Sequence, residues 1–343
     1  MSKAEQILKI LRDELRGGYY KPGTKFPSEQ KLMKRFHTSR ITINKVTSVL
    51  ADGGFIKRGV QGSGTRVLDT SPFPVGFVAY IGPVDNLYYA RMIRGIQRTA
   101  LLKNYALCIL SPGENQHGFW LEKIRHSGFR GLLATGIGTV PDLYPIPVVY
   151  LDHGYEPHGS GRGSVTCTNY RGAAEMMEQV IMRGHREILV CSSYCAMEEC
   201  RMERIRGFLE TLKKHRIHDA EKRFFHEAIT DSVSAKSLLQ NMLRLFPKTT
   251  VILTDSDDIA YKLLYASEEM LPTRQIAITG FGNLAYSSDY RRLPGVEQHP
   301  EEIGAQGTSE LLRMIADSNY VPEGLQEIET DLVHLDKLPI LNH

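Results

Sequence analysis

The sequence contains few cysteines and no long apolar run. Its 343 residues include five cysteines, an odd number, and no pair has the Cys-x-x-Cys spacing of a structural zinc site. No segment approaches the roughly 20 apolar residues that a membrane-spanning helix needs, and the N-terminal segment is charged and amphipathic, unlike a secretion signal. These absences favour a protein of the reducing cytoplasm with no membrane partner.

Metal and catalytic sites are also poorly supported. Cys191, Cys195 and Cys200 follow His185, but their spacing matches no strong zinc pattern, so no metal is expected. The glycine-rich stretch 159–163 lacks the lysine of a phosphate-binding loop and is interpreted as a polar surface loop. No Ser/His/Asp or paired-carboxylate arrangement stands out, so the sequence predicts neither an enzyme nor a cofactor.

Charge is distributed unevenly along the chain. Residues 1–69 hold 14 Lys and Arg against 6 Asp and Glu, a net charge of +8, whereas the remainder holds 28 against 33, a net charge of −5. A basic head on an acidic body is typical of a polyanion-binding domain joined to a domain with another task. The alternative is an ordinary solvated basic face. The length suits two or three domains.

Residues 26–67 predict two short helices followed by a glycine-tipped hairpin. Ser28 and Ser39 are placed to cap the two helices, and Gly53-Gly54 can end the second, because glycine tolerates a left-handed cap. The apolar positions follow helical spacing, with Leu32, Met33 and Phe36 in the first helix and Ile43, Val46 and Leu50 in the second.

Polar side chains occupy the first turns of the second helix, where a recognition helix contacts a major groove. Arginine commonly pairs with guanine and asparagine with adenine, whereas threonine and lysine suit phosphates. The glycines of the hairpin tip allow close approach to a minor groove, although they equally suit a plain turn. The predicted DNA-binding residues are Gln30, Ser39, Arg40, Thr42, Asn44, Lys45, Gly62, Ser63 and Gly64.

This segment resembles the winged helix-turn-helix of the GntR family of bacterial regulators. The resemblance rests on Pro27-Ser28-Glu29, Ser39-Arg40-x-Thr42-Ile43, the helix exit over 50–56 and the wing Gly62-x-Gly64-Thr65. It implies that residues 1–69 bind double-stranded operator DNA. The family usually has arginine where this chain has Gln30 and Asn44, so an operator sequence does not transfer from relatives.

After a proline-containing linker at 70–74, apolar strands and amphipathic helices alternate to the end of the chain. This alternation predicts an α/β fold with parallel sheets covered by helices on both faces. The pattern contains about a dozen strands, more than one sheet usually holds, so residues 75–343 are expected to form two lobes. Ligands of such sheets bind beyond the carboxyl ends of the strands.

The same region resembles the effector-binding domain of the LacI/GalR repressors, which has the periplasmic-binding-protein fold. The resemblance rests on ordered short motifs: Tyr88-Tyr89-Ala90-x-x-Ile93-Arg94-Gly95, Pro147-x-x-x-Leu151-Asp152, Asn169-Tyr170-Arg171-Gly172, Arg204-x-x-Gly207-Phe208, Gly280-Phe281 and Gln298-x-Pro300. A GntR-type head joined to such a body is an arabinose-repressor-like architecture.

A sugar site needs convergent polar partners and an aromatic platform for the apolar sugar face. By position, the resemblance implies an effector site in which Arg204 holds the ligand, although a structural role is the alternative for each residue. Two acidic residues of the family are absent, since Gly282 and Thr168 stand in their places, so we expect an unusual ligand or a rearranged pocket. The predicted effector-binding residues are Tyr88, Tyr89, Asp152, Arg204, Ser256, Asp257 and Gln298.

Together the two resemblances predict a transcriptional regulator, a repressor of carbohydrate-utilisation genes, whose operator affinity changes when a sugar binds between the lobes. A homodimer would place two heads on a pseudo-palindromic operator. Two alternatives stay open, a sugar-binding protein of transport type and a regulator that responds to a non-sugar ligand. An enzyme of sugar metabolism would need a catalytic constellation that the sequence does not offer.

Overall fold

The structure is a computed structural model of the chain and describes residues 3–59, 64–68, 76–113, 116–137, 140, 143, 145–153, 162–193, 199–284 and 291–341. The chain divides into two compact units, Met1–Gly76 with Asn104–Ala106, and Phe77–Lys103 with Leu107–His343. We call residues 3–68 the head and residues 76–341 the body. Within the described ranges, no helix is both long and apolar enough to cross a membrane.

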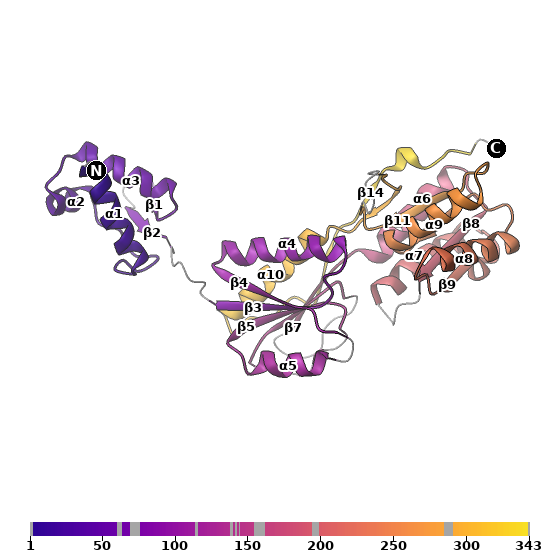
Figure 1. Cartoon of the computed structure of the whole chain (residues 1–343), viewed down its shortest axis with the longest axis horizontal. Helices are drawn as coiled ribbons and strands as arrows, with labels where there is room; N and C mark the ends of the chain where they lie inside the picture. Colours follow the sequence, from indigo (N-terminus) through magenta and orange to yellow (C-terminus); the bar gives the residue numbers. More distant parts are fainter. Residues whose placement is uncertain are drawn as a thin grey trace. The chain divides into compact units, whose positions relative to one another are not determined.

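Three helices and a two-stranded antiparallel sheet form the head (Figure 1). Their apolar faces share one core, to which α1, α2, α3, β1 and β2 all contribute. The elements are α1 (Lys3–Arg16), α2 (Glu29–Phe36), α3 (Arg40–Asp52), β1 (Ile56–Arg58) and β2 (Thr65–Val67).

The predicted helix caps of the head are confirmed. The Ser28 side chain accepts a hydrogen bond from the Lys31 N–H at 3.4 Å, and the Ser39 side chain accepts one from the Thr42 N–H at 3.3 Å. His37, between the two helices, has a left-handed φ of 45°, which turns the chain from α2 into α3. The serines thus fix where each helix begins.

The first lobe of the body is a six-stranded sheet with the order β13-β7-β6-β5-β3-β4. The described pairings of β13, β7, β6, β5 and β3 are parallel. Helices α4 (Leu87–Leu102) and α10 (Pro300–Ala316) pack together on one face, and α5 (His117–Arg125) lies on the other (Figure 1). The strands are β3 (Gly76–Ile81), β4 (Tyr105–Leu110), β5 (Phe129–Ala134), β6 (Val148–Leu151), β7 (Arg162–Cys167) and β13 (Leu325–Ile328).

The second lobe has the strand order β14-β12-β11-β10-β8-β9, in which only the edge strand β14 is antiparallel among the described pairs. Helix α6 packs on α7, and α8 packs on α9. The strands are β8 (Ile188–Ser193), β9 (Phe224–Glu227), β10 (Val251–Thr254), β11 (Ala277–Phe281), β12 (Gly295–Glu297) and β14 (Asp331–Val333). The helices are α6 (Asn169–Met182), α7 (Glu199–Lys214), α8 (Ser232–Leu245) and α9 (Asp257–Met270), with short 3-10 helices at Ala220–Arg223 and Leu335–Lys337.

The prediction of an α/β body with two lobes and parallel sheets is therefore confirmed, with β14 as the exception. The chain passes between the lobes after β7, β12 and β13. Two of these crossings are tied together, because the hydroxyls of Thr168 and Thr330 lie 3.1 Å apart and the Thr330 N–H donates to Thr168 Oγ1 at 3.1 Å. Thr168 is thus part of the crossover, where the resemblance led us to expect an acidic ligand partner.

One local interpretation of the sequence is wrong. The stretch 159–163 was expected to be a polar surface loop, but Arg162 and Gly163 begin β7, while 159–161 lie outside the described residues. Gly163 is buried, and a Cβ there would lie 3.4 Å from Glu310 Cγ. That is an ordinary van der Waals distance, so Gly163 is a buried residue of β7 at which packing does not require a glycine.

Candidate functional site

The predicted DNA-binding side chains lie at the N-terminal ends of α2 and α3. Gln30, Arg40 and Lys45 are exposed, and Thr42 and Asn44 are half-buried. Ser39 is occupied by its capping role, since it accepts from the Thr42 N–H and its hydroxyl lies 3.0 Å from Thr42 Oγ1. The arrangement presents a mixed cationic and amide surface of the kind that contacts phosphates and base edges.

Arg40 is oriented by a neighbour that the sequence did not single out. Its Nε donates to Glu29 Oε2 at 2.9 Å, an ion pair between α3 and the first residue of α2. The two terminal guanidinium nitrogens stay available on the exposed side of Arg40. These are the nitrogens that form a bidentate contact with the O6 and N7 atoms of guanine.

The hairpin is held against helix α3 by hydrogen bonds. Arg58 of β1 donates to Thr47 Oγ1 at 2.8 Å and to the Asn44 carbonyl at 3.2 Å. At the hairpin tip, Gly64 has a left-handed φ of 74° and its carbonyl accepts from the Gly59 N–H at 3.1 Å. The predicted contacts Gly62 and Ser63 lie outside the described residues.

In the body, the seven predicted effector residues line one cavity of about 150 Å³. The cavity lies at the carboxyl ends of the strands, where α/β sheets bind ligands. Its wall includes Asp152, which follows β6, Ser256, which follows β10, and Gln298, which follows β12. The first turn of α4 also contributes to the wall. The remaining predicted residues on its wall are Tyr88, Tyr89, Arg204 and Asp257, and the residues not predicted are Asn86, Cys200, Arg201, Asp258, Phe281 and Leu284.

A larger cavity, of about 810 Å³, lies elsewhere in the second lobe. It is bordered by Thr250 and Ile276, just before β10 and β11, and therefore lies at the amino ends of these strands. None of the predicted site residues lines it. Because ligands of such sheets bind at the opposite edge, we take the smaller cavity as the effector site.

Arg204 is the buried centre of the smaller cavity. Its side chain is 5% exposed, and its guanidinium group lies 4.3 Å from the ring centre of Phe281. Nε donates to Asn169 Oδ1 at 2.7 Å, Nη1 donates to the Asp255 carbonyl at 2.9 Å, and Nη2 lies 3.9 Å from Asp152 Oδ1. Burial works against its charge, but Asp152 together with Cys167, Cys200 and Tyr88 outweighs this and keeps the pKa of Arg204 above its usual value.

Asp257 brings a second buried charge to the cavity. Burial raises the pKa of Asp257 to about 7, although a hydrogen bond from the Leu284 N–H opposes the change. Its carboxylate fills the space beside two glycines: a Cβ on Gly280 would lie 2.0 Å from Oδ1, and one on Gly282 would lie 3.3 Å from Oδ2. A carboxylate is therefore present beside Gly282, where the resemblance had suggested that one is missing.

Two buried polar atoms of the cavity have no hydrogen-bond partner within the described part of the chain, Asp152 Oδ1 and Ser256 Oγ. Buried polar atoms are seldom left unpaired in folded proteins. Beside them Tyr88 and Tyr89 pack edge to face, with ring centres 5.5 Å apart, and the Tyr88 hydroxyl accepts from Gln298 Nε2 at 3.5 Å. The site thus combines two oxygens that accept no hydrogen bond from the described residues, one of them in the ion pair with Arg204, with an aromatic wall.

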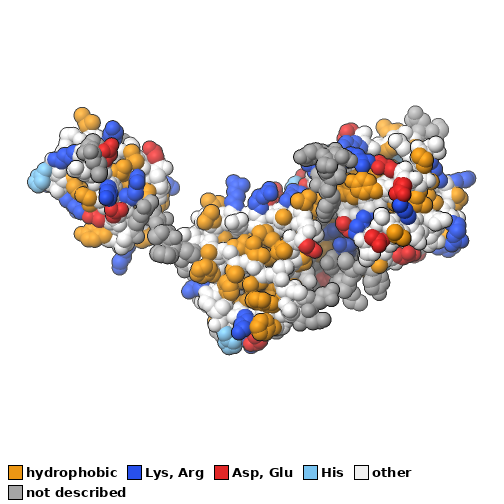
Figure 2. Space-filling view, in the orientation of Figure 1, with side chains coloured by type: hydrophobic (Ala, Val, Ile, Leu, Met, Phe, Trp, Pro, Cys, Tyr) orange, Lys and Arg blue, Asp and Glu red, His pale blue; other side chains and the backbone are white. Residues whose placement is uncertain are grey.

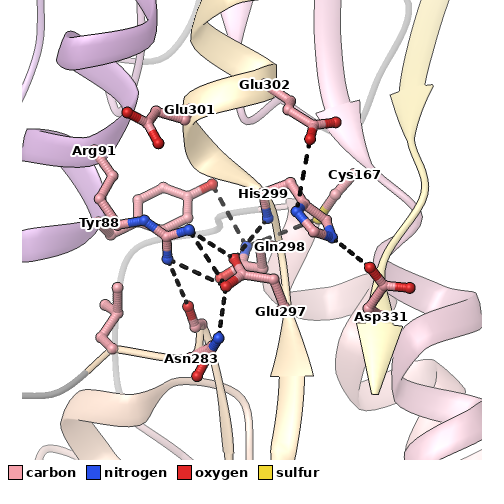
Figure 3. A network of polar contacts seen from close by, with 12 residues as sticks. Tyr88, Arg91, Cys167, Asn283, Glu297, Gln298, His299, Glu301, Glu302 and Asp331 are labelled. Atoms are coloured by element: carbon pink, nitrogen blue, oxygen red, sulfur yellow. Dashed lines mark hydrogen bonds and ion pairs between the residues drawn. The ribbon is translucent and has the colours of Figure 1, made fainter. Parts of the chain in front are cut away.

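A polar network joins the lobes next to Gln298 (Figure 3). Arg91 of α4 forms an ion pair with Glu297 of β12 at 3.2 Å, and Glu297 is nearly buried. The same carboxylate accepts from Asn283 Nδ2 and from the His299 N–H, each at 2.8 Å. Arg91 also reaches the Gly282 carbonyl at 3.5 Å. Sequence reasoning missed this network, because no local spacing links residues 206 positions apart.

Comparison with known families identifies the kind of domain in which each of these two sites lies. Residues 76–325 match the family of periplasmic binding proteins and sugar binding domain of LacI family, and residues 3–67 match the bacterial regulatory proteins of the gntR family. The chain belongs to the family of periplasmic binding proteins and sugar binding domains of the LacI family, and it carries a GntR-type DNA-binding head. One family comprises binding proteins and the other transcriptional regulators, so neither is a family of enzymes, as the sequence predicted.

This GntR/LacI-type regulator is similar over nearly its whole length to the arabinose metabolism transcriptional repressor of Halalkalibacterium halodurans. The two are 23% identical over 347 aligned positions, covering 92% of this chain and 89% of that protein. Other curated regulators match the head alone, and these matches span only 25% to 34% of their own length.

Solved structures share the fold of this regulator. The transcriptional regulator CelR in complex with cellobiose has a TM-score of 0.65 at 16% identity, over 86% of this chain and 90% of that chain. A LacI-family regulator from Enterococcus faecium with bound ribose has a TM-score of 0.65 at 16% identity, over 78% of this chain and 100% of that chain. At these identities the likeness establishes the fold alone.

The pKa of Asp257 generates a pH-dependent prediction. A carboxylate whose pKa is raised from 3.8 to about 7 binds its proton more tightly in the folded state. Its contribution to stability is therefore greatest below pH 4 and falls as the pH rises towards 7. Replacing Asp257 with Asn should raise the melting temperature relative to the wild type, and by more at pH 8 than at pH 5.

Thermal unfolding at both pH values measures this change. The matched control is Asp258→Asn, which removes an exposed carboxylate from the same turn of α9. Its melting temperature should differ from that of the wild type by the same amount at both pH values. An Asp257→Asn variant that follows the control would contradict a raised pKa for Asp257.

Proposed function

We propose that this chain is a repressor of carbohydrate-utilisation genes and that a sugar bound in the interlobe cavity releases it from its operator. The observation that carries the proposal is the cavity itself. It joins a buried guanidinium group, three carboxylates, a serine hydroxyl and an edge-to-face tyrosine pair at the carboxyl ends of strands from both lobes. A ligand there contacts both lobes, so its affinity depends on how they are arranged.

The chemistry of the cavity suits a monosaccharide. Carboxylates and guanidinium groups pair with hydroxyls, and the oxygens of Asp152 and Ser256 that have no hydrogen-bond partner among the described residues would gain one from a sugar hydroxyl. Tyrosine rings cover the apolar face of a sugar ring. A volume of about 150 Å³ lies below the roughly 300–1,000 Å³ of sites for drug-sized ligands, which favours a small polar molecule.

The relatives support the same proposal. One similar protein is named for the repression of arabinose metabolism, and two similar structures contain ribose or cellobiose. A repressor of genes for sugar use lets the sugar induce its own metabolism when the sugar weakens the hold of the repressor on DNA. We therefore propose release as the direction of the response.

We also propose that the chain acts as a homodimer through the first lobe. Apolar side chains are exposed on neighbouring elements of that lobe, and Figure 2 shows hydrophobic side chains gathered there. Leu101 and Leu102 at the end of α4 are 71% and 77% exposed. Phe77 of β3 and Ile109 of the edge strand β4 are also exposed. An apolar surface at a sheet edge is typical of a protein interface.

The dimer face can be tested with one charged substitution. We expect the wild type to be a dimer by light scattering at micromolar concentration and Leu102→Glu to be a monomer with weaker operator binding, because a carboxylate would be buried in the interface. Val321→Glu is the matched control: Val321 is 79% exposed and precedes β13, at the opposite edge of the same sheet. If both variants stay dimeric, the proposed face is wrong.

The sugar site can be tested by thermal shift against pentoses, hexoses, uronic acids and sugar phosphates. A sugar that binds the folded body raises the melting temperature by mass action. Asp152→Asn should weaken that sugar about 10-fold or more, because the loss of a charged hydrogen-bond partner costs about 1.5–3 kcal/mol. Asn also tolerates the left-handed φ of 55° at this position.

A suitable control for this substitution is Asp219→Asn. Asp219 has an equally left-handed φ of 57° but does not line the cavity. It should leave the sugar affinity unchanged. The absence of any shift at millimolar sugar would contradict a sugar ligand, and an Asp152→Asn variant with wild-type affinity would contradict the assignment of the cavity.

A further inference from the structure

One apolar side chain lies among the polar residues of the DNA-binding surface. Ile41 is 82% exposed, more than any other large apolar side chain in the described part of the chain. It belongs to the first turn of α3, between Arg40 and Thr42, and its neighbour Ile43 is fully buried in the head core. Ile41 is therefore on the outer face of the helix, and the fold of the head does not require it.

Helix formation does not explain an isoleucine at this position. A β-branched residue loses side-chain freedom in a helix, and an exposed site gives no packing energy in return. Single exposed apolar residues are common on protein surfaces. Ile41, however, lies between Arg40 and Thr42, both of which are predicted to contact DNA. It would therefore lie close to the DNA in a complex with the operator.

The major groove offers one apolar group to a protein, the C5-methyl of thymine. Glu29 accepts a hydrogen bond from Arg40 Nε at 2.9 Å, which orients the arginine, and Ile41 is the next residue of the same exposed helix turn. We propose that Ile41 determines specificity by contacting a thymine methyl in each operator half-site. This inference rests on the proposed DNA-binding function of the head.

The test uses the full chain and duplexes that it enriches from a random-sequence library. Each enriched thymine is then replaced by deoxyuridine, which lacks only the methyl group and keeps the base pair. For the wild type we expect one thymine per half-site at which this change weakens binding about fourfold, the equivalent of exposing one methyl group, and about 16-fold when both half-sites are changed.

Ile41→Ala should bind the thymine and deoxyuridine duplexes with equal affinity, because the methyl group has lost its partner. The matched control is Val49→Ala, which shortens an exposed apolar side chain in the last turns of the same helix. It should keep the wild-type ratio between the two duplexes. Since Ile41 contributes nothing to the core and alanine favours a helix, Ile41→Ala should keep the fold and its melting temperature should not fall.

The outcomes separate this inference from the function on which it rests. If no duplex is enriched, the proposed DNA-binding function fails and this inference fails with it. If duplexes are enriched but deoxyuridine has no effect at any thymine, operator binding stands and the role of Ile41 is overturned. An Ile41→Ala variant that keeps the sensitivity to deoxyuridine would also overturn it, because another side chain would then contact the methyl group.

Discussion

The effector domain is organised around one buried positive charge. Taking a guanidinium group out of water costs several kcal/mol, so its partners must be positioned accurately. For Arg204 these partners come from three places far apart in the sequence: Asn169 begins α6, Asp255 follows β10 and Asp152 follows β6. By pairing with Arg204, these residues hold the ends of strands from both lobes at the cavity. Oxygens beside the guanidinium group can then also contact a ligand.

A second set of charged residues connects the two lobes. Arg91 and Glu297 connect α4 to β12, and Asn283 and the His299 N–H complete the pairing of the carboxylate (Figure 3). This network lies one turn of α4 from Tyr88 and next to Gln298, both of which line the cavity. A ligand that contacts these neighbours therefore acts close to the contacts that hold the two lobes together, which suits a domain that responds to binding by a change of arrangement.

Local patterns in the sequence were sufficient for the head and for the layout of the body. Cap residues and helical spacing predicted α2 and α3, because these features act over three or four residues. They failed over 159–163, since glycine occurs in both turns and strands and this short stretch carries no pattern that distinguishes the two. The short strands β9 and β12, of four and three residues, carried no pattern long enough to be predicted.

The effector site could not be predicted from spacing, because its residues are scattered from position 86 to position 298. Family resemblance supplied seven of them, and the structure brings those seven to one cavity. It could not supply the consequences of this chain's own departures. Gly282 lacks a carboxylate, yet Asp257 fills the adjoining space, and Thr168 bonds Thr330 across the crossover instead of facing a ligand. Such substitutions are understood only when distant neighbours are known.

We propose that a sugar in the cavity and an operator on the head oppose each other. The most direct measurement is the sugar affinity of the full chain, with and without saturating operator duplex, using the sugar identified by thermal shift. Linkage requires operator DNA to weaken sugar binding by the same factor by which the sugar weakens operator binding. We expect both affinities to fall by a common factor of about 5 to 150, the usual range of such coupling. A sugar affinity that operator DNA leaves unchanged would contradict it.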